Sequence, residues 1–182
     1  MKIAFTGASG TGKTTLAKYV SETFDLPLNP VGCRSTLKEM GFADIPAMEA
    51  AGSRARFQER LSTRKFIWES DRTDFVTDRS GFDDLAYAML ECPLDIQHDQ
   101  IWRARRMLED VDLIFWCPIS VYQKLDGDPN RKVSSRYHAA FEQLLETVLD
   151  QYWSKVVRIN SAELEHRKSQ VAHEIDQFKG FR

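Results

Sequence analysis

Short runs of apolar residues alternate along the chain with longer stretches in which apolar residues recur at spacings of three and four. The short runs are typical of buried strands, and they cover residues 3–5, 28–31, 74–80, 111–117 and 155–159. Pro30 makes the second run a poor strand, because proline cannot donate a backbone hydrogen bond. The periodic stretches predict helices over residues 13–24, 36–40, 52–70, 83–90, 99–108 and 137–152, and a last helix that begins at Asn160-Ser161 with Ser161 as N-cap.

The link between the first strand and the first helix fits the phosphate-loop pattern G-x-x-x-x-G-K-[ST] at every fixed position. Its glycines let the backbone approach a phosphate, and the amides that open the helix attract the anion. A glycine-rich turn that merely joins strand to helix is the alternative. The strand before the loop and the helix after it favour a nucleoside-triphosphate site, with Lys13 on the β- and γ-phosphates and Thr14 on Mg²⁺. The residues expected at this site are Gly7, Ala8, Ser9, Gly10, Thr11, Gly12, Lys13, Thr14 and Thr15.

Composition limits the classes of function. With 182 residues, 42% of them hydrophobic and 29% charged, residues 1–182 are expected to form one domain. The net charge of −2 argues against a partner made of duplex nucleic acid, and no apolar run is long enough to span a membrane. The chain starts with a core strand, which predicts no signal peptide. Cys33, Cys92 and Cys117 lack metal-site spacing, which favours free thiols in a reducing cytoplasm.

The third strand ends in Asp78-Arg79-Ser80. An aspartate at the carboxyl end of a core strand can hold Mg²⁺ opposite the phosphate loop, and the planar guanidinium of Arg79 can grip a phosphate. An exposed ion pair is the alternative for this dipeptide. In the helix that follows, Asp83 is expected to fix Arg79 or the helix start, and Tyr87 either lines the cleft or packs in the core.

Other candidates for the acceptor site lie just after the predicted strand 28–31 and on the predicted helix 52–70. Arg34 follows the second strand, where open parallel sheets place ligand contacts, or else it is a solvated side chain. Arg54 and Gln58 lie one helical turn apart and either face the cleft together or stay on the surface. Phe57 belongs to an apolar stripe, so it is a core residue or a contact for the base of an acceptor.

Two later stretches complete the predicted site. Residues 124–137 contain a Gly/Pro/Asp-rich segment followed by Arg131 and Arg136, which predicts a lid over the phosphates, with an exposed basic turn as the alternative. The turn after the last strand, with Asn160 and Ser161, is expected to lie beside the phosphate loop, where an adenine could rest.

Together these residues resemble the nucleoside and nucleotide kinase branch of phosphate-loop proteins over nearly the whole chain. The resemblance is closest to thymidylate-kinase-like and nicotinamide-riboside-kinase-like members, a group that includes small AAA-type ATPases of phage genomes. It implies a three-layer α/β fold with flanking helices around a five-stranded parallel sheet of order 2-3-1-4-5. It also implies an ATP donor with Mg²⁺, and related kinases often form homodimers. Deoxynucleoside kinases of this branch typically carry Glu-Arg-Ser where this chain has Asp78-Arg79-Ser80.

The sequence therefore favours an ATP-dependent kinase of (deoxy)nucleoside monophosphates in the cytoplasm. A monophosphate acceptor needs cations, which Arg34, Arg54 and Arg79 could supply, whereas a sugar hydroxyl benefits from a base. Lys13, Asp78, Arg79, Arg131 and Arg136 are the expected catalytic residues. Three alternatives stay open: a nucleoside kinase for a deoxynucleoside or nicotinamide riboside, a kinase for a modified base in DNA, and a nucleotide-binding regulator whose hydrolysis acts as a timer.

Overall fold

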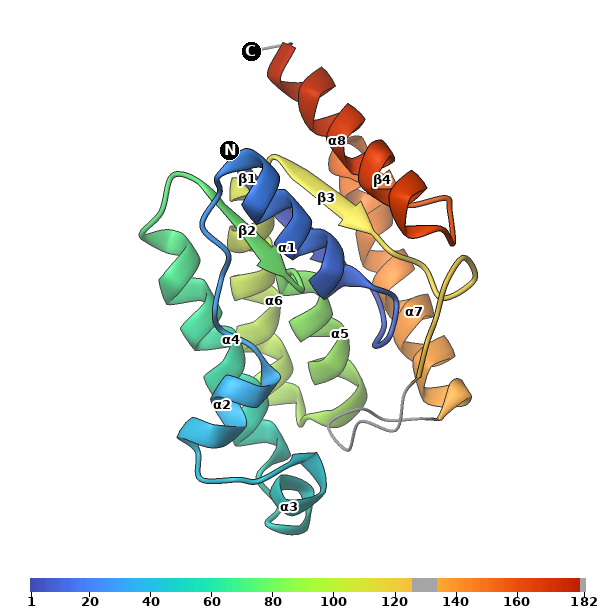
Figure 1. The fold of residues 1–182 in the computed structure, drawn as a ribbon. Coiled ribbons are helices and arrows are strands. Elements are labelled where there is room, and N and C mark those ends of the chain that lie inside the picture. Colours follow the sequence, from blue (N-terminus) through green and yellow to red (C-terminus); the bar gives the residue numbers. More distant parts are fainter. Residues whose placement is uncertain (126–133, 181–182) are drawn as a thin grey trace.

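The computed structural model describes residues 1–125 and 134–180, and it shows a sheet with helices on both faces (Figure 1). The elements in chain order are β1 (Lys2–Thr6), α1 (Lys13–Phe24), α2 (Cys33–Glu39), α3 (Ile45–Ala50), α4 (Arg54–Ser70), β2 (Phe75–Asp78), α5 (Gly81–Glu91), α6 (Leu94–Asp110), β3 (Leu113–Trp116), α7 (Ser135–Leu149), the 3₁₀ helix η1 (Asp150–Lys155), β4 (Val156–Arg158) and α8 (Leu164–Gly180).

The sheet is parallel and has four strands in the order β2-β1-β3-β4 within the described residues. Ile3 of the central strand β1 pairs with Val76 on one side and with Leu113 on the other. The predicted α/β class with a parallel sheet is confirmed. The prediction was five strands in the order 2-3-1-4-5. When the predicted second strand is left out, the remaining order, 3-1-4-5, is the observed order β2-β1-β3-β4. Because the strands are parallel, β1, β2 and β3 bring their carboxyl ends to one edge, at Thr6, Asp78 and Trp116.

The segment predicted as the second strand, residues 28–31, is not a strand. Leu28 forms a single parallel bridge to Val76, with backbone hydrogen bonds of 2.9 Å on each side of it. Pro27 and Pro30 flank this bridge, and neither has the N–H group that a longer ladder requires. The segment still runs beside β2, so it leads α2 towards the carboxyl edge of the sheet.

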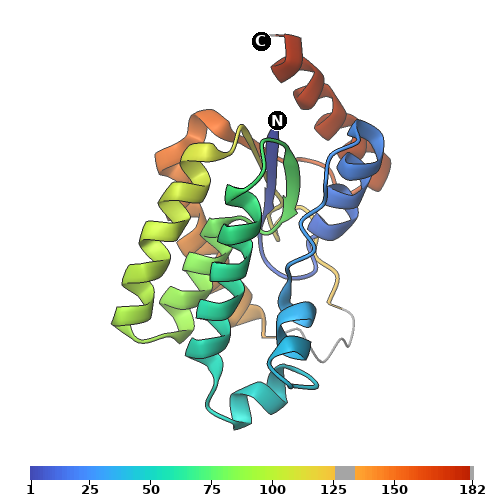
Figure 2. The same cartoon turned by 90° about the vertical axis from the view of Figure 1, so that its left-hand side faces the viewer.

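Two layers of helices cover the sheet, as the edge-on view in Figure 2 shows. On one face α1 and α8 bury Leu16, Val20, Val171 and Ile175. On the other face α5, α6 and α7 bury residues that include Phe82, Leu108, Phe141 and Leu145. Both faces of the strands are thus withdrawn from water, which explains why the strands read as continuous apolar runs.

A smaller apolar cluster joins α2 and α3 to α4 beyond the edge of the sheet. Its members are Val31, Leu37, Met48, Phe57 and Leu61. Phe57, one of the candidates for contact with an acceptor, therefore packs in this cluster as well.

The last helix differs from its prediction, since α8 begins at Leu164 and not at Ser161. The hydroxyl of Ser161 accepts a hydrogen bond from the backbone N–H of Glu163 at 3.1 Å, so it organises the turn before the helix. In the described part of the chain, every helix is too short or too polar to cross a membrane.

Candidate active site

The phosphate loop lies at the carboxyl edge of the sheet and is held in place by distant parts of the chain. Gly10 has φ of 80°, and a Cβ there would lie 2.4 Å from the carbonyl oxygen of Lys124. Gly12 has φ of 82°, and its Cβ would lie 2.6 Å from Nη1 of Arg167 in α8. Any larger residue would be strained and would also displace these neighbours. The loop glycines therefore serve packing as well as the approach of a phosphate.

Lys13 is folded onto the loop itself. Its Nζ donates to the carbonyl oxygen of Ala8 at 2.5 Å and to Oγ1 of Thr11 at 3.3 Å, and the residue is 4% exposed. Burial, helped by the nearby Arg79 charge, lowers the pKa of Lys13 to about 8. A buried ammonium of this kind gains from an anion placed against it, because the anion offsets the desolvation of the charge.

Thr14 and Asp78 form the expected pair for a divalent cation. Oγ1 of Thr14 donates to Oδ2 of Asp78 at 2.5 Å. The other carboxylate oxygen, Oδ1 of Asp78, is buried without a hydrogen-bond partner in the described residues. A hydroxyl and a carboxylate are ligands that Mg²⁺ prefers, and Mg²⁺ usually takes only one or two protein ligands besides phosphate oxygens. The two side chains therefore fit a magnesium site. Within the described residues, no cluster of three or more metal-binding side chains occurs.

Arg79 joins the phosphate loop to the helices beside it. Its Nη2 donates to Oγ of Ser9 at 3.1 Å, and its Nη1 donates to the hydroxyl of Tyr87 at 3.0 Å. Its backbone has a φ angle of 83°, which is unfavourable for any residue other than glycine. The carbonyl oxygen of Arg79 accepts a hydrogen bond from Nζ of Lys65 at 3.0 Å, which stabilises this conformation.

Asp83 is a structural link rather than a group that faces a ligand. One oxygen accepts from Oγ1 of Thr6 at 2.7 Å and from the N–H of Ser80 at 2.8 Å, and the other accepts from the N–H of Gly7 at 3.1 Å. Ser80 and Asp83 also form the capping box that starts α5. The alternative that Asp83 fixes the helix start matches this geometry, and Asp83 also lies 3.6 Å from Nη1 of Arg79.

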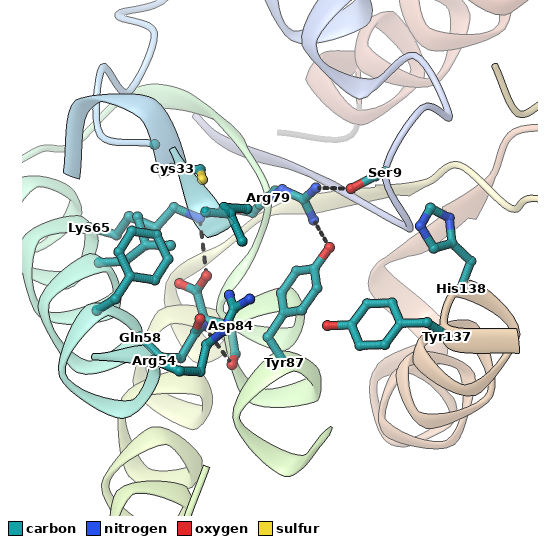
Figure 3. Close-up of a pocket in the computed structure, with 14 residues that line it drawn as sticks. Ser9, Cys33, Arg54, Gln58, Lys65, Arg79, Asp84, Tyr87, Tyr137 and His138 are labelled. Carbon is teal, nitrogen blue, oxygen red and sulfur yellow. Dashed lines mark hydrogen bonds and ion pairs between the residues drawn. The ribbon is translucent and has the colours of Figure 1, made fainter. Parts of the chain in front are cut away.

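Two cavities meet at Ser9 and Arg79. The phosphate cavity has a volume of about 560 Å³, and its walls include Ser9, Lys13, Thr14, Arg34, Asp78 and Arg79. This volume is in the range of about 300–1,000 Å³ that is usual for small-molecule sites. The inner cavity is smaller, about 80 Å³, and its walls include Arg54, Phe57, Gln58, Lys65, Asp84 and Tyr87 (Figure 3).

The structure brings most of the predicted residues to these two cavities. Arg34 lies in the first turn of α2 and lines the phosphate cavity, as does Thr15. In the inner cavity, Nε of Arg54 lies 3.0 Å from Oε2 of Glu91, and Nε2 of Gln58 donates to the carbonyl oxygen of Asp84 at 3.1 Å.

Some predicted residues are not among the described residues that line the two cavities. Arg136 is exposed in the first turn of α7, and it is not among the described residues that line either cavity. Arg131 lies outside the described residues, so the lid stays a prediction. Asn160 and Ser161 are on the surface after β4, and among the described lining residues of the two cavities neither occurs.

Three charged residues at the site were missed in the sequence. Lys65 and Asp84 line the inner cavity, and Nη2 of the buried Arg167 donates to the carbonyl oxygen of Thr11 at 2.6 Å. A signal existed for two of them. Lys65 follows Leu61 by four positions on an otherwise apolar stripe, and Arg167 precedes Val171 by four. A charge in such a position indicates a buried ionic contact.

A family model described as an AAA domain matches residues 2–167 of the chain. The chain belongs to this AAA-domain family. No curated protein sequence gives a match to it.

Solved structures show which folds this AAA-domain chain shares. It is similar to a NadR protein in complex with NR, with a TM-score of 0.73 and 18% identity over 98% of this chain and 50% of that one. It is also similar to thymidylate kinase from Candida albicans, with a TM-score of 0.64 and 17% identity. That match covers 100% of this chain and 93% of the thymidylate kinase. A third match is deoxyadenosine kinase from M. mycoides with bound dCTP, with a TM-score of 0.63 and 12% identity. That match covers 97% of this chain and 100% of the deoxyadenosine kinase. The chain spans half the length of the NadR protein. The AAA-domain chain thus has the fold of P-loop nucleoside and nucleotide kinases.

Proposed function

We propose that the chain is an ATP-dependent phosphotransferase that converts a (deoxy)nucleoside monophosphate to the diphosphate. The observation that carries this proposal is the position of Arg79. Its guanidinium contacts Ser9 in the phosphate loop and Tyr87 in the wall of the inner cavity, so one cation faces both cavities. A donor triphosphate in one cavity and an acceptor in the other would meet at this side chain.

On the donor side of this proposal, Lys13 turns from the carbonyl oxygen of Ala8 towards the phosphates. The loop amides and Lys13 hold the β- and γ-phosphates, and Thr14 and Asp78 would hold Mg²⁺, which supplies charge neutralisation on the phosphates when it is bound. Catalysis of phosphoryl transfer consists mostly of positioning and electrostatic stabilisation, which these groups provide. Arg131 and Arg136 of the predicted lid would neutralise charge that develops during transfer.

The acceptor phosphate would lie near the meeting point of the cavities. Arg79 is the cation at that point, and Arg34 in the wall of the phosphate cavity is the second. Arg54 is a weaker candidate, because it forms ion pairs with Glu49 and Glu91. The base of the acceptor would then occupy the inner cavity beside Phe57 and Tyr87.

A nucleoside acceptor is the second candidate, and one observation favours it. Oδ1 of Asp78 has no hydrogen-bond partner among the described residues, so it can accept the proton of a sugar hydroxyl as a general base. The similarity to a NadR protein in complex with NR agrees with this candidate.

The test is formation of ADP from ATP and Mg²⁺ with a panel of nucleosides and their monophosphates, each at several concentrations. Turnover with monophosphates and none with nucleosides supports the first candidate, and the reverse result supports the second. Slow ADP formation that no small acceptor accelerates contradicts both candidates. That result would point to a regulator or, where a DNA polymer is phosphorylated, to a kinase for a modified base.

A further inference from the structure

Two carbonyl groups of the phosphate loop are held by the segment that follows β3. The carbonyl oxygen of Ser9 accepts a hydrogen bond from Nε2 of Gln123 at 3.0 Å, and that of Gly10 accepts one from the backbone N–H of Lys124 at 3.0 Å. In a trans peptide the C=O group and the N–H group of the next residue point in opposite directions. The N–H groups of Gly10 and Thr11 therefore point away from these contacts, and no described residue accepts a hydrogen bond from either.

The peptide between Ser9 and Gly10 belongs to the wall of the phosphate cavity, since both residues line it. Gly10 has φ of 80° and no Cβ, so on its own this peptide could rotate. A rotated peptide would present its carbonyl oxygen, which carries partial negative charge, to the phosphates. The hydrogen bond from Gln123 thus keeps a donor, and not an acceptor, on the side of the phosphates.

A second residue fixes the amide of Gln123. Its Nε2 also lies within hydrogen-bond distance of Nδ1 of His138, which is 2% exposed and lies in the first turn of α7, at the Ser9 end of the inner cavity (Figure 3). Because one N–H of this amide is used on the carbonyl oxygen of Ser9, the other is directed at His138, whose Nδ1 is then an acceptor without a proton. The opposite orientation of the amide would set Oε1 against the carbonyl oxygen. His138 therefore favours the orientation in which Gln123 donates to the phosphate loop.

We propose that Gln123 and His138 are positioning residues for ATP, which together preset the peptide between Ser9 and Gly10 so that its N–H faces the triphosphate. This inference rests on the proposed function, since it takes ATP to be the ligand of the phosphate cavity. A loop that is ordered before binding binds more tightly, because the ligand does not have to order it. Gln123 is not among the described residues that line either cavity, so it acts through the loop and not on the acceptor.

Gln123→Leu tests the first contact, because it keeps the size of the side chain and removes the donor. We expect the Kd for a non-hydrolysable ATP analogue with Mg²⁺, measured by calorimetry, to rise about tenfold. The KM for ATP should rise likewise, while the KM for the acceptor stays the same. Gln143→Leu, on the exposed face of α7, is the matched control and should change neither. An unchanged Kd in Gln123→Leu, or an equal rise of both KM values, would overturn the inference.

Two substitutions of His138 distinguish hydrogen bonding from packing. In His138→Asn the acceptor Oδ1 is bonded to Cγ, as Nδ1 is in histidine, so this variant should keep most of the affinity for the ATP analogue. His138→Leu fills the space but accepts no hydrogen bond, and its Kd should rise about tenfold. A residue needed only for packing would give the reverse order, which would contradict the inference. This comparison holds even if Gln123→Leu does not fold.

The double variant of Gln123→Leu and His138→Leu tests whether the two residues act in series. Without the amide of Gln123, His138 has no group left to orient. The double variant should therefore bind the ATP analogue about as weakly as Gln123→Leu alone, a non-additive result. If the two effects multiply, the residues act independently and the proposed series is wrong.

The binding experiments need no acceptor, so they separate the inference from the proposed function. If Gln123→Leu weakens binding of the ATP analogue but the unaltered protein phosphorylates no acceptor, the inference holds and the proposed function fails. If transfer occurs and the variants bind the analogue as the unaltered protein does, the inference alone fails. An unaltered protein that does not bind the analogue contradicts both.

Discussion

The phosphate cavity and the inner cavity share Ser9 and Arg79 but are built in different ways. In the phosphate cavity the key groups come from the phosphate loop and from the end of β2. Lys13 is buried there, and Oδ1 of Asp78 has no hydrogen-bond partner in the part of the chain that the structure describes. In the inner cavity most charged groups come from separate helices and neutralise one another, as Lys65 and Asp84 do.

Because of this difference, we expect substitutions in the phosphate cavity to change activity and substitutions of paired groups to change stability. A group that awaits a ligand adds little to the folded state, and Lys13, whose pKa is lowered by burial, opposes folding in its charged form. A group that is paired within the protein supports the fold, and its loss leaves a buried partner without a hydrogen bond. Substitutions in the two regions should therefore affect different measurements.

The largest effect is expected from Lys13→Met. Loss of this cation should lower kcat/KM for ATP by about 10²–10³-fold, the usual cost of removing one group that stabilises charge in the transition state. The midpoint of urea unfolding should stay the same or rise, because a buried charge is removed. Lys18→Met, on the exposed face of the same helix, is the matched control and should change neither quantity. A large fall in the stability of Lys13→Met would contradict the proposed difference between the phosphate cavity and the inner cavity.

Asp83→Ala should show the opposite behaviour. It leaves the hydroxyl of Thr6 and the N–H groups of Gly7 and Ser80 without their acceptor. We expect the free energy of unfolding to fall by about 2–4 kcal/mol, since each buried donor left unpaired costs about 1–3 kcal/mol. Urea unfolding measures this, with Asp176→Ala as the exposed control. Unchanged stability with lost turnover would place Asp83 among the groups that face a ligand.

A smaller effect is expected at the cation site. In Asp78→Asn the carboxylate that would hold Mg²⁺ becomes neutral, so the Mg²⁺ concentration needed for half-maximal ADP formation should rise about tenfold or more. Chelation of divalent cations should stop transfer in the unaltered protein. If Asp78→Asn requires the same Mg²⁺ concentration as the parent, Asp78 is not part of a magnesium site.

The smallest effect concerns pH. Since the pKa of Lys13 is about 8, its charge is lost as pH rises through that value, and affinity for ATP should fall about tenfold between pH 7 and 9. The unfolded lysine keeps its proton up to about 10.4, so over this range the unfolded state binds more protons and this residue adds stability as pH rises. Calorimetric titration of ATP follows the affinity, and Lys13→Met should remove this pH dependence.

The sequence predicted the phosphate cavity well because its groups are local. Strand, loop and helix follow one another from Lys2 to Phe24. The roles proposed for Lys13 and Thr14 rest on their spacing within the loop pattern. Asp78 and Arg79 follow from their place at the end of a strand. The missing second strand was predictable in part, because Pro27 and Pro30 both lack the donor that a ladder needs.

The inner cavity was predicted less well because its chemistry depends on contacts between distant residues. Arg54, Gln58 and Tyr87 were candidates, but the sequence did not reveal that Lys65 pairs with Asp84 nineteen positions later. Arg167 contacts the phosphate loop from the far end of the chain, a contact that no spacing rule predicts. Charges placed on apolar stripes are the one signal that pointed to these residues.

The fate of the γ-phosphoryl group tests the account most directly. The protein is mixed with ATP labelled at the γ-position, Mg²⁺ and the best acceptor of the panel, and the label is followed in acceptor, inorganic phosphate and protein. The account predicts that label appears in the acceptor in step with ADP, and that Lys13→Met prevents this while Lys18→Met does not. Label that appears only as inorganic phosphate, or that moves equally well with Lys13→Met, would contradict it.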